Sequence, residues 1–326
     1  MKLDLYNYQA EKAFMQKHLI KLQDYSQDEI YQVLSKALEL KQKHKEKIPH
    51  PYLSGKSLGM IFTKSSTRTR VSFEVGIYQL GGYALFLNAN DIQLGRGETI
   101  GDTASVLSRY LDGLMIRTFR QEDVEELAQY SSIPVINGLT DLLHPCQVLA
   151  DLMTIYEKKG ALAGLKLAFI GDGNNVCHSL LIGCTKVGMH ISVACPEGYL
   201  PKQEIMETAM KNGMATGADV LITHDPLEAI RDADVVYTDV WASMGQEEDF
   251  VNRVKHFSPY QVNIKLFSHA KDDAIFMHCL PAHRGEEVTS DVIDGPRSVV
   301  FDEAENRLHA HKAIMVLLMG DRANNK

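Results

Sequence analysis

The sequence lacks any apolar run that approaches the length of a membrane span. Residues 1–20 mix Asp4 and Glu11 with lysines, so they have neither the continuous apolar centre of a secretory signal nor the arginine-rich character of a transit peptide. These absences predict a cytoplasmic protein that has no membrane partner.

Cysteines are few, with five among 326 residues, and none of them lies in a Cys-x-x-Cys pair. Neither a disulfide framework nor a structural zinc site is therefore predicted. A basic excess is also lacking, because the formal net charge is −8. That charge argues against nucleic acid as a partner, but it leaves room for a local phosphate site built from clustered arginines.

Short apolar runs alternate with helical periods along the whole chain. A capping-box pattern at Ser26 and Glu29 opens a first helix that should end near Lys45. The later elements follow β-α-β order, which predicts parallel sheets covered on both faces. The expected strands are 58–62, 83–87, 113–116, 134–136, 165–170, 191–194, 219–222, 235–238 and 275–278. The expected later helices are 69–80, 102–111, 122–131, 146–159 and 304–319.

The length of the chain makes two domains the default. The helix expected over 146–159 is followed by Gly160, a common helix end, and its length suits a bridge between domains. We therefore predict an α/β protein of two doubly wound parallel-sheet domains, 1–148 and 149–303, joined by this bridging helix.

The segment 65–70 (SSTRTR) stands where strand 58–62 gives way to a helix. Unpaired N–H groups in the first turn of a helix attract anions, and a guanidinium fork matches phosphate oxygens two at a time. The segment therefore predicts a site for a multiply charged oxyanion. A Ser/Thr helix cap with solvated arginines is the simpler alternative.

Three other polar motifs follow expected strands or begin an expected helix. Segment 171–175 (GDGNN) starts like a dinucleotide fingerprint, but Val176 replaces the third glycine, which disfavours a nicotinamide cofactor. Its asparagines suit a polar ligand such as an amino acid, or simply form a turn. Segment 144–147 (HPCQ) begins the bridging helix, where a histidine is as often structural as catalytic. Segment 239–245 (DVWASMG) could hold an ammonium group or form an ordinary loop.

Two motifs near the C-terminus leave more than one interpretation open. In 278–281 (HCLP), Cys279 suits a nucleophile, a base or a small buried apolar side chain. A cis Leu-Pro bond there would turn a backbone carbonyl toward a ligand. Segment 302–307 (DEAENR) is either the acidic first turn of the last helix or a site that ends in Arg307.

Eight segments together resemble the aspartate/ornithine carbamoyltransferase family, in family order and over nearly the whole chain. They are SSTRTR (65–70), DIQLGRGE (91–98), MIRTF with Arg117, HPCQ (144–147), GDGNN (171–175), DVWASMG (239–245), HCLP (278–281) and AENR (304–307). The resemblance implies transfer of the carbamoyl group from carbamoyl phosphate to the δ-amine of L-ornithine, giving citrulline and phosphate in arginine metabolism, with neither metal nor cofactor. It implies that domain 1–148 binds carbamoyl phosphate, that domain 149–303 binds ornithine, and that the C-terminal helix, 304–326, returns to the first domain.

The resemblance also assigns residues to each substrate. Carbamoyl phosphate would be bound by Ser66, Thr67, Arg68, Thr69, Gln93, Arg117, His144, Gln147, Cys279, Leu280 and Arg307. Ornithine would be bound by Asn175, Asp239, Ser243 and Met244. Arg117, His144 and Cys279 would be the catalytic residues, with Cys279 either accepting a proton or only positioning substrate. Gln93 would reach a neighbouring subunit's site, which implies a homotrimer with shared active sites.

Three alternatives remain beside an ornithine-specific enzyme. An aspartate-specific relative would need cations for two carboxylates, and the loop 91–98 has no lysine. Putrescine is the closest alternative acceptor, although the Ser-Met-Gly turn at 243–245 favours ornithine. A non-catalytic phosphate-binding protein would leave His144, Gln147 and Cys279 without a task.

Overall fold

The computed structural model describes residues 4–92, 97–241 and 250–320. Contacts divide the chain into unit 1, Met1–Met153 with Glu305–Lys326, and unit 2, Thr154–Ala304. Both units are parallel-sheet α/β domains, which confirms the predicted fold class. Helix α5 (Pro145–Lys159) runs across the division at 153/154, where the sequence predicts a boundary at 148/149.

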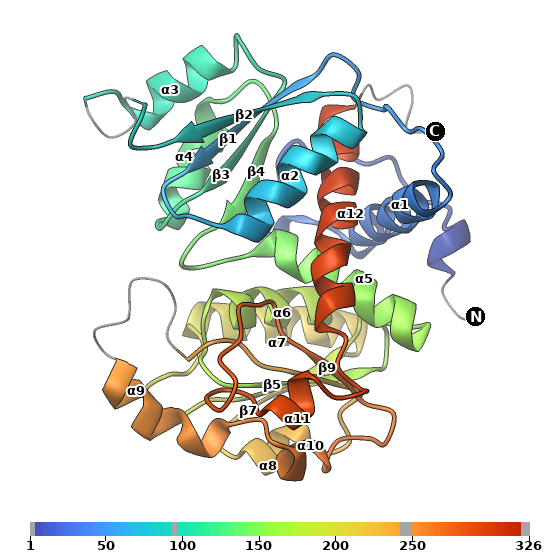
Figure 1. The fold of residues 1–326 in the computed structure, drawn as a ribbon, viewed down its shortest axis with the longest axis vertical. Helices are drawn as coiled ribbons and strands as arrows, with labels where there is room; N and C mark the ends of the chain where they lie inside the picture. The colour runs from blue at the N-terminus through green and yellow to red at the C-terminus, as the bar shows by residue number, and fades with distance from the viewer. Residues whose placement is uncertain (1–3, 93–96, 242–249, 321–326) are drawn as a thin grey trace. The chain divides into compact units, whose positions relative to one another are not determined.

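Unit 1 contains a four-stranded parallel sheet in the order β2-β1-β3-β4 (Figure 1). Its strands are β1 (Ser57–Phe62), β2 (Tyr83–Asn88), β3 (Gly113–Arg117) and β4 (Val135–Leu139). The chain moves outward from β1 to β2 and then returns past β1 to β3 and β4. Because such crossovers are right-handed, α2 lies on one face of the sheet, and α3 and α4 pack together on the other. These helices are α2 (Thr67–Gln79), α3 (Ile100–Leu107) and α4 (Gln121–Tyr130).

Helix α1 and most of helix α12 complete unit 1. Helix α1 (Gln27–Lys45) begins at the predicted capping box, in which Ser26 Oγ accepts from Glu29 N at 3.2 Å and Glu29 Oε2 accepts from Ser26 N at 2.8 Å. Helix α12 (Val300–Met319) starts earlier than predicted, so the acidic residues of 302–307 lie inside its first turns. Short 3₁₀ turns occur at Leu5–Asn7 and Leu22–Asp24.

Unit 2 contains a five-stranded parallel sheet in the order β7-β6-β5-β8-β9. Its strands are β5 (Lys166–Ile170), β6 (His190–Ala194), β7 (Val220–Thr223), β8 (Val235–Tyr237) and β9 (Ile275–Met277). Its helices are α6 (Asn175–Lys186), α7 (Gln203–Thr216), α8 (Pro226–Ile230), α9 (Phe250–Phe257), α10 (Ile264–Phe267) and α11 (Ser290–Ile293), with a 3₁₀ turn at Ser258–Tyr260. The chain winds one way through β7 and then returns to β8, so α6 packs with α7 and α8 packs with α10.

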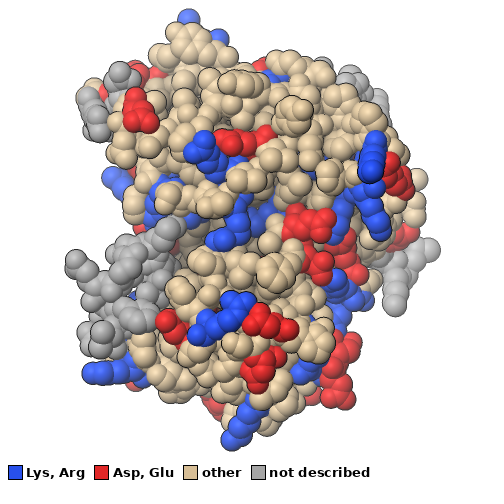
Figure 2. Space-filling model, viewed as in Figure 1, with Lys and Arg blue, Asp and Glu red and all other residues tan. Residues whose placement is uncertain are grey.

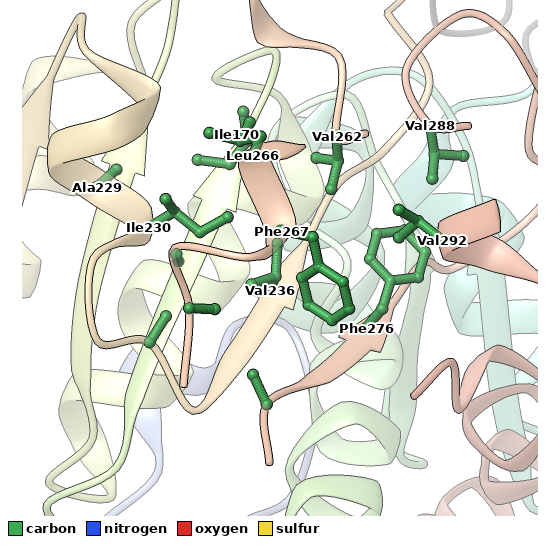
Figure 3. Packing of buried hydrophobic residues seen from close by; sticks show 14 of the residues in the cluster. Ile170, Ala229, Ile230, Val236, Val262, Leu266, Phe267, Phe276, Val288 and Val292 are labelled. Carbon is green, nitrogen blue, oxygen red and sulfur yellow. The ribbon is translucent and has the colours of Figure 1, made fainter. Parts of the chain in front are cut away.

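The core of unit 2 fills the space between the sheet and its shorter helices (Figure 3). Val236 and Phe276 of the sheet face Ile230 of α8, Phe267 of α10 and Val292 of α11. The rings of Phe267 and Phe276 meet edge to face, with centroids 6.2 Å apart. Burial of each such side chain contributes about 1.5–3 kcal/mol, so this layer holds α8, α10 and α11 against the sheet.

In each sheet the winding direction reverses at one pair of adjacent strands, β1 with β3 in unit 1 and β5 with β8 in unit 2. Ligands of open α/β sheets bind outside the carboxyl ends of the strands at such a reversal. Segment 65–70 follows β1, while 171–175 and 239–241 follow β5 and β8. The topology therefore predicts a ligand site in each unit where the polar motifs lie.

Across the described parts of the chain, no helix combines the length and the apolar character that a bilayer crossing requires. On the face drawn in Figure 2, acidic and basic side chains are interspersed, and uncharged areas separate them.

Candidate active site

The first group of candidate residues lies at the junction of β1 and α2 in unit 1. Ser66 is the N-cap of α2, since its Oγ accepts from Thr69 N at 3.2 Å. The cap predicted as the simpler alternative is therefore present. It does not exclude an anion site, because a hydroxyl has one hydrogen besides its lone pairs, and the Ser66 hydrogen remains available to an oxyanion. The helix N-terminus adds its partial positive charge at the same place.

The two arginines of the motif have different surroundings. Arg70 Nε donates to Glu74 Oε1 at 3.0 Å, and its guanidinium lies 3.7 Å from the ring centroid of Phe86. Arg68 is half-buried, whereas the neighbouring Thr67 is exposed to solvent. Since Arg70 is held on the surface between α2 and β2, Arg68 is the arginine of this motif that we expect to bind phosphate.

Three buried side chains from β3, the β4–α5 loop and α12 share one electropositive environment. They are Arg117, His144 and Arg307, and Arg307 Nη2 donates to Thr69 Oγ1 at 2.7 Å. Burial lowers the pKa of His144 well below its usual value, and the positive charges of Arg307 and Arg117 lower it further. His144 is therefore a neutral imidazole near pH 7, which can donate one N–H to a carbonyl oxygen without being a charged acid.

The loop that carries His144 is fixed by its own hydrogen bonds. Thr140 N donates to Leu143 O at 2.8 Å, and Leu143 N donates to Thr140 Oγ1 at 3.0 Å. The Lys64 ammonium pairs with Asp141, which ties the β1–α2 loop to this loop. The sequence analysis did not predict a role for Lys64. Its position directly before the 65–70 motif is the one feature that could have indicated it.

Gln147 is fully buried on the first turns of α5. Its Nε2 donates to Asp151 Oδ1 at 2.8 Å, one helical turn further along. In unit 1 the structure therefore brings the side chains of Thr69 and Arg307 into contact and fixes the backbone around His144. Ser66 is the N-cap of α2, and Thr67 and Arg68 lie in its first turn.

The second group of candidates lies in unit 2 around the carboxylate of Asp239. Asp239 Oδ1 accepts from Cys279 Sγ at 3.1 Å and from Val240 N at 2.8 Å, while Oδ2 accepts from Asn174 Nδ2 at 2.8 Å. Asn174 also caps α6, because its Oδ1 accepts from Cys177 N at 3.1 Å. The structure therefore places Asn174 against Asp239, whereas the sequence assigned Asn175, which is the first residue of α6.

The buried imidazole of His278 supports the turn that contains Cys279. Leu280 N donates to His278 Nδ1 at 2.9 Å, and His278 Nε2 lies 3.2 Å from Glu287 Oε1. Leu280 has φ of 57°, which is uncommon for a side chain other than glycine and is typical of functional sites. The following bond to Pro281 is cis. Cys279 and Leu280, which the sequence assigned to carbamoyl phosphate, thus lie in unit 2, where Cys279 contacts Asp239.

An ion pair beside this group was not predicted from the sequence. Arg253 of α9 donates to Asp172 and to the carbonyl of Trp241. Burial raises the pKa of Asp172 to about 6, while the Arg253 charge opposes that shift, so the carboxylate is charged near pH 7. Asp172 lies within the 171–175 motif, but its partner comes from a helix that carries no motif.

Gln93, Ser243 and Met244 lie outside the described residues.

Two groups of ligand-type side chains in the described ranges come close enough to suit a metal ion. They are Asp239 with His278 and Cys279, and His283 with Glu286 and Glu287. Both ring nitrogens of His278 already have protein partners, so metal binding there would break the support of the Cys279 turn. A reaction without metal stays a prediction.

The cysteines differ in accessibility, which gives a direct chemical test of the unit 2 site. Cys146, Cys177, Cys184 and Cys195 are buried, while Cys279 is half-buried. Burial also raises the pKa of Cys146 to about 12. Because the reagent must reach the thiol, and because Cys146 is buried with a raised pKa, brief treatment of the native protein with iodoacetamide should label Cys279 at least about tenfold faster than Cys146. Peptide mass spectrometry measures this, and faster labelling of Cys146 would contradict the burial described above.

Comparison with known proteins places the chain in one family over both units. The family model for the aspartate/ornithine carbamoyltransferase carbamoyl-P binding domain matches residues 17–157, and that for the Asp/Orn binding domain matches 163–318. The chain is 61% identical to an ornithine carbamoyltransferase of Carboxydothermus hydrogenoformans, over 94% of this chain and 99% of the relative. A relative of that name from Thermococcus kodakarensis is also 61% identical, over 92% and 95%.

A solved structure agrees with these sequence relatives. The ornithine carbamoyltransferase of Pyrococcus furiosus matches with a TM-score of 0.92 and 57% identity, and the match covers 94% of this chain and 98% of that one. The chain therefore belongs to the aspartate/ornithine carbamoyltransferase family.

Proposed function

We propose that the protein transfers the carbamoyl group of carbamoyl phosphate to the δ-amine of L-ornithine and releases L-citrulline and phosphate. The observation that carries this proposal is the 61% identity to the Carboxydothermus hydrogenoformans ornithine carbamoyltransferase over nearly the full length of both chains. The arrangement of cations in unit 1 and of Asp239 in unit 2 supports it chemically.

Carbamoyl phosphate is assigned to unit 1. The first turn of α2 supplies the Ser66 hydroxyl, backbone N–H groups and the Arg68 guanidinium to the phosphate. Phosphate gains negative charge as it leaves, so these donors stabilise the transition state more than the ground state. The reaction class is acyl transfer with phosphate as leaving group, in which the residues of α2 bind and neutralise that group.

The carbonyl oxygen of the substrate becomes negatively charged when the amine attacks. Arg117 and neutral His144 would donate to this oxygen, and Thr69 is held in position for it by Arg307. A single well-placed donor of this kind contributes about 3 kcal/mol to lowering the barrier. Gln147 would contact the carbamoyl amide from the start of α5.

Ornithine is assigned to unit 2, where Asp239 would pair with its α-ammonium group. Asn174 and the Val240 N–H orient this carboxylate. Asn175, Ser243 and Met244 are proposed to contact the same substrate. We infer that Asn174 belongs with them as the residue that positions Asp239.

Cys279 is proposed to position substrate rather than to accept the proton. Its thiol donates to Asp239 Oδ1. A thiol that keeps the hydrogen it donates to Asp239 Oδ1 cannot take up the proton of the amine. The departing phosphate is the better acceptor, because it gains charge as the C–O bond breaks while the amine loses its proton.

A parallel product assay tests the proposed function. Carbamoyl phosphate is offered with L-ornithine, putrescine or L-aspartate, and the carbamoylated product is quantified. We expect kcat/KM for ornithine to exceed that for the other two by at least about a hundredfold. L-Aspartate has no second amine for Asp239, and putrescine lacks the α-carboxylate that the Ser-Met-Gly sequence at 243–245 is proposed to accommodate. Preferred turnover of putrescine would support the alternative acceptor. Binding of carbamoyl phosphate without any product would indicate a binding protein.

We also propose a homotrimer in which Gln93 reaches a neighbouring copy, and a cytoplasmic location. An exposed apolar face on unit 1 supports self-association. It is formed by Val71, Val75 and Tyr78 of α2 and by Tyr83 of the edge strand β2, and the tyrosines are 78% and 68% exposed. Arg70 and Glu74 form an ion pair on the same helix beside these side chains.

Light scattering tests the assembly. The wild-type protein should have three times the mass of one chain, and Tyr78→Glu with Val75→Glu should reduce it, because two carboxylates would be buried against an apolar partner. A trimer that persists in this double variant would exclude this face as the interface.

A further inference from the structure

Helix α12 lies alongside the helix that carries the proposed phosphate site (Figure 1). The two helices touch at four levels, all within unit 1. Arg307 bonds Thr69, His311 meets Ser72, Met315 and Lys312 pack at Gly76, and Lys312 bonds Gln79. A Cβ at Gly76 would lie 3.0 Å from Met315 Cε, so the glycine permits this close approach.

Ser72 is the point where α12 reaches the first turn of α2. Its Oγ lies 2.6 Å from Arg68 O, 3.2 Å from Thr69 O and 2.8 Å from His311 Nδ1. A hydroxyl has a single hydrogen, and the shortest contact assigns it to Arg68 O, so we assign the His311 tautomer whose Nδ1–H donates to Ser72 Oγ. The hydrogen-bond chain therefore runs from His311 through Ser72 to the carbonyls of Arg68 and Thr69.

The ring of His311 has little freedom to move. It is fully buried and stacks on Phe73, with centroids 4.0 Å apart and planes 15° from parallel. Burial holds the pKa of His311 well below its usual value, and the Arg307 charge lowers it further. The imidazole is thus neutral near pH 7 and keeps the one N–H that it donates to Ser72.

We propose that His311 is a positioning residue for carbamoyl phosphate, which acts through Ser72 on the first turn of α2. The backbone of Arg68 and Thr69 carries the side chains assigned to the phosphate and to the carbonyl oxygen. The hydrogen bonds from Ser72 to these two carbonyls fix the backbone of the turn, and therefore the direction in which its N–H groups and side chains point. This inference rests on the proposed function of α2 as the phosphate site.

The decisive measurement is the affinity of the full-length protein for inorganic phosphate, determined by calorimetry. His311→Leu introduces an apolar side chain of comparable size and removes the Nδ1–H donor. Loss of one hydrogen bond of about average strength corresponds to about fivefold weaker binding. We expect the same fivefold change for Ser72→Ala, and no further change in the double variant, because both substitutions break one chain.

Steady-state kinetics separates positioning from a general loss of structure. In His311→Leu the KM for carbamoyl phosphate should rise about fivefold and kcat should also fall, because the residues of this turn stabilise the leaving phosphate, while the KM for ornithine changes less than twofold. His311→Asn should restore most of the affinity, because its amide nitrogen stands as far along the side chain as Nδ1. A structural role alone would not be rescued by an amide of different shape.

His309→Leu is the matched control, since His309 is an equally buried imidazole in α12 whose ring lies 5.7 Å from that of His44 on α1. It should leave phosphate affinity within about twofold. The proposal is overturned if folded His311→Leu binds phosphate like the wild type, or if His309→Leu loses as much affinity. If Arg68→Ala also binds phosphate normally, the proposed site itself fails, which is a distinguishable result.

Discussion

Arg68→Ala is expected to lower kcat/KM for carbamoyl phosphate by about a thousandfold. The guanidinium of Arg68 stands on the first turn of α2, beside the Ser66 cap and the helix N-terminus. Its removal takes away phosphate contacts in the bound substrate and charge stabilisation as phosphate leaves, and each such electrostatic donor changes rates by about a hundredfold to a thousandfold. Initial rates measured across both substrate concentrations check the effect.

Arg70→Ala is the matched control for this experiment. Arg70 lies two positions further along the same helix, but its guanidinium lies on Phe86 and bonds Glu74. We therefore expect its loss to change phosphate affinity less than about twofold, although stability falls slightly. Turnover of Arg68→Ala near the wild-type level would remove α2 from the proposed mechanism.

Asp239→Asn is expected to lower kcat/KM for ornithine by about a hundredfold, while inorganic phosphate binds as in the wild type. The substitution keeps the shape of the side chain but removes the negative charge that would pair with the α-ammonium group. Hydrogen bonds to charged groups contribute about 1.5–3 kcal/mol, which corresponds to that change. It also turns one acceptor into a donor that faces Asn174 Nδ2.

Asp234→Asn tests whether the effect belongs to the site or to β8. Asp234 precedes the same strand at its opposite end, where it pairs with Lys271 at 2.8 Å and accepts from Lys166 N at 2.9 Å. We expect this variant to lose stability without a change in the KM for ornithine. If Asp239→Asn weakens phosphate binding and leaves ornithine kinetics intact, the assignment of substrates to the two units is wrong.

The sheet architecture was predictable because buried parallel strands appear as short apolar runs. All nine expected strands exist among the described residues, and the largest shift is at β4, which runs Val135–Leu139 instead of 134–136. The continuation of β4 beyond residue 136 was not predicted, because the asparagine and glycine at 137–138 are uncommon in strands. Helix α12 begins at Val300, before the predicted Ala304. The start was misplaced because acidic residues are compatible both with the first turn of a helix and with a loop before it.

The position of the candidate site was predictable where a motif carries several residues of one chemistry, as in 65–70, and its role as a phosphate site stays a prediction. The contacts that hold it were not, because they join positions far apart in the sequence. Ser72 and His311 are separated by 239 residues, and Arg253 and Asp172 by 81. Asn174 and Asn175 are adjacent and chemically identical, so only the helix start distinguishes the capping residue from the first helical one.

The division of unit 1 into two chain segments, Met1–Met153 and Glu305–Lys326, has a consequence for synthesis on the ribosome. The N-terminal segment emerges first, but Thr69 and Ser72 gain Arg307 and His311 only after all of the intervening residues have been translated. Unit 2 is one continuous segment and can fold as soon as it emerges. The first turn of α2 is therefore among the last parts of the nascent chain to reach its final geometry.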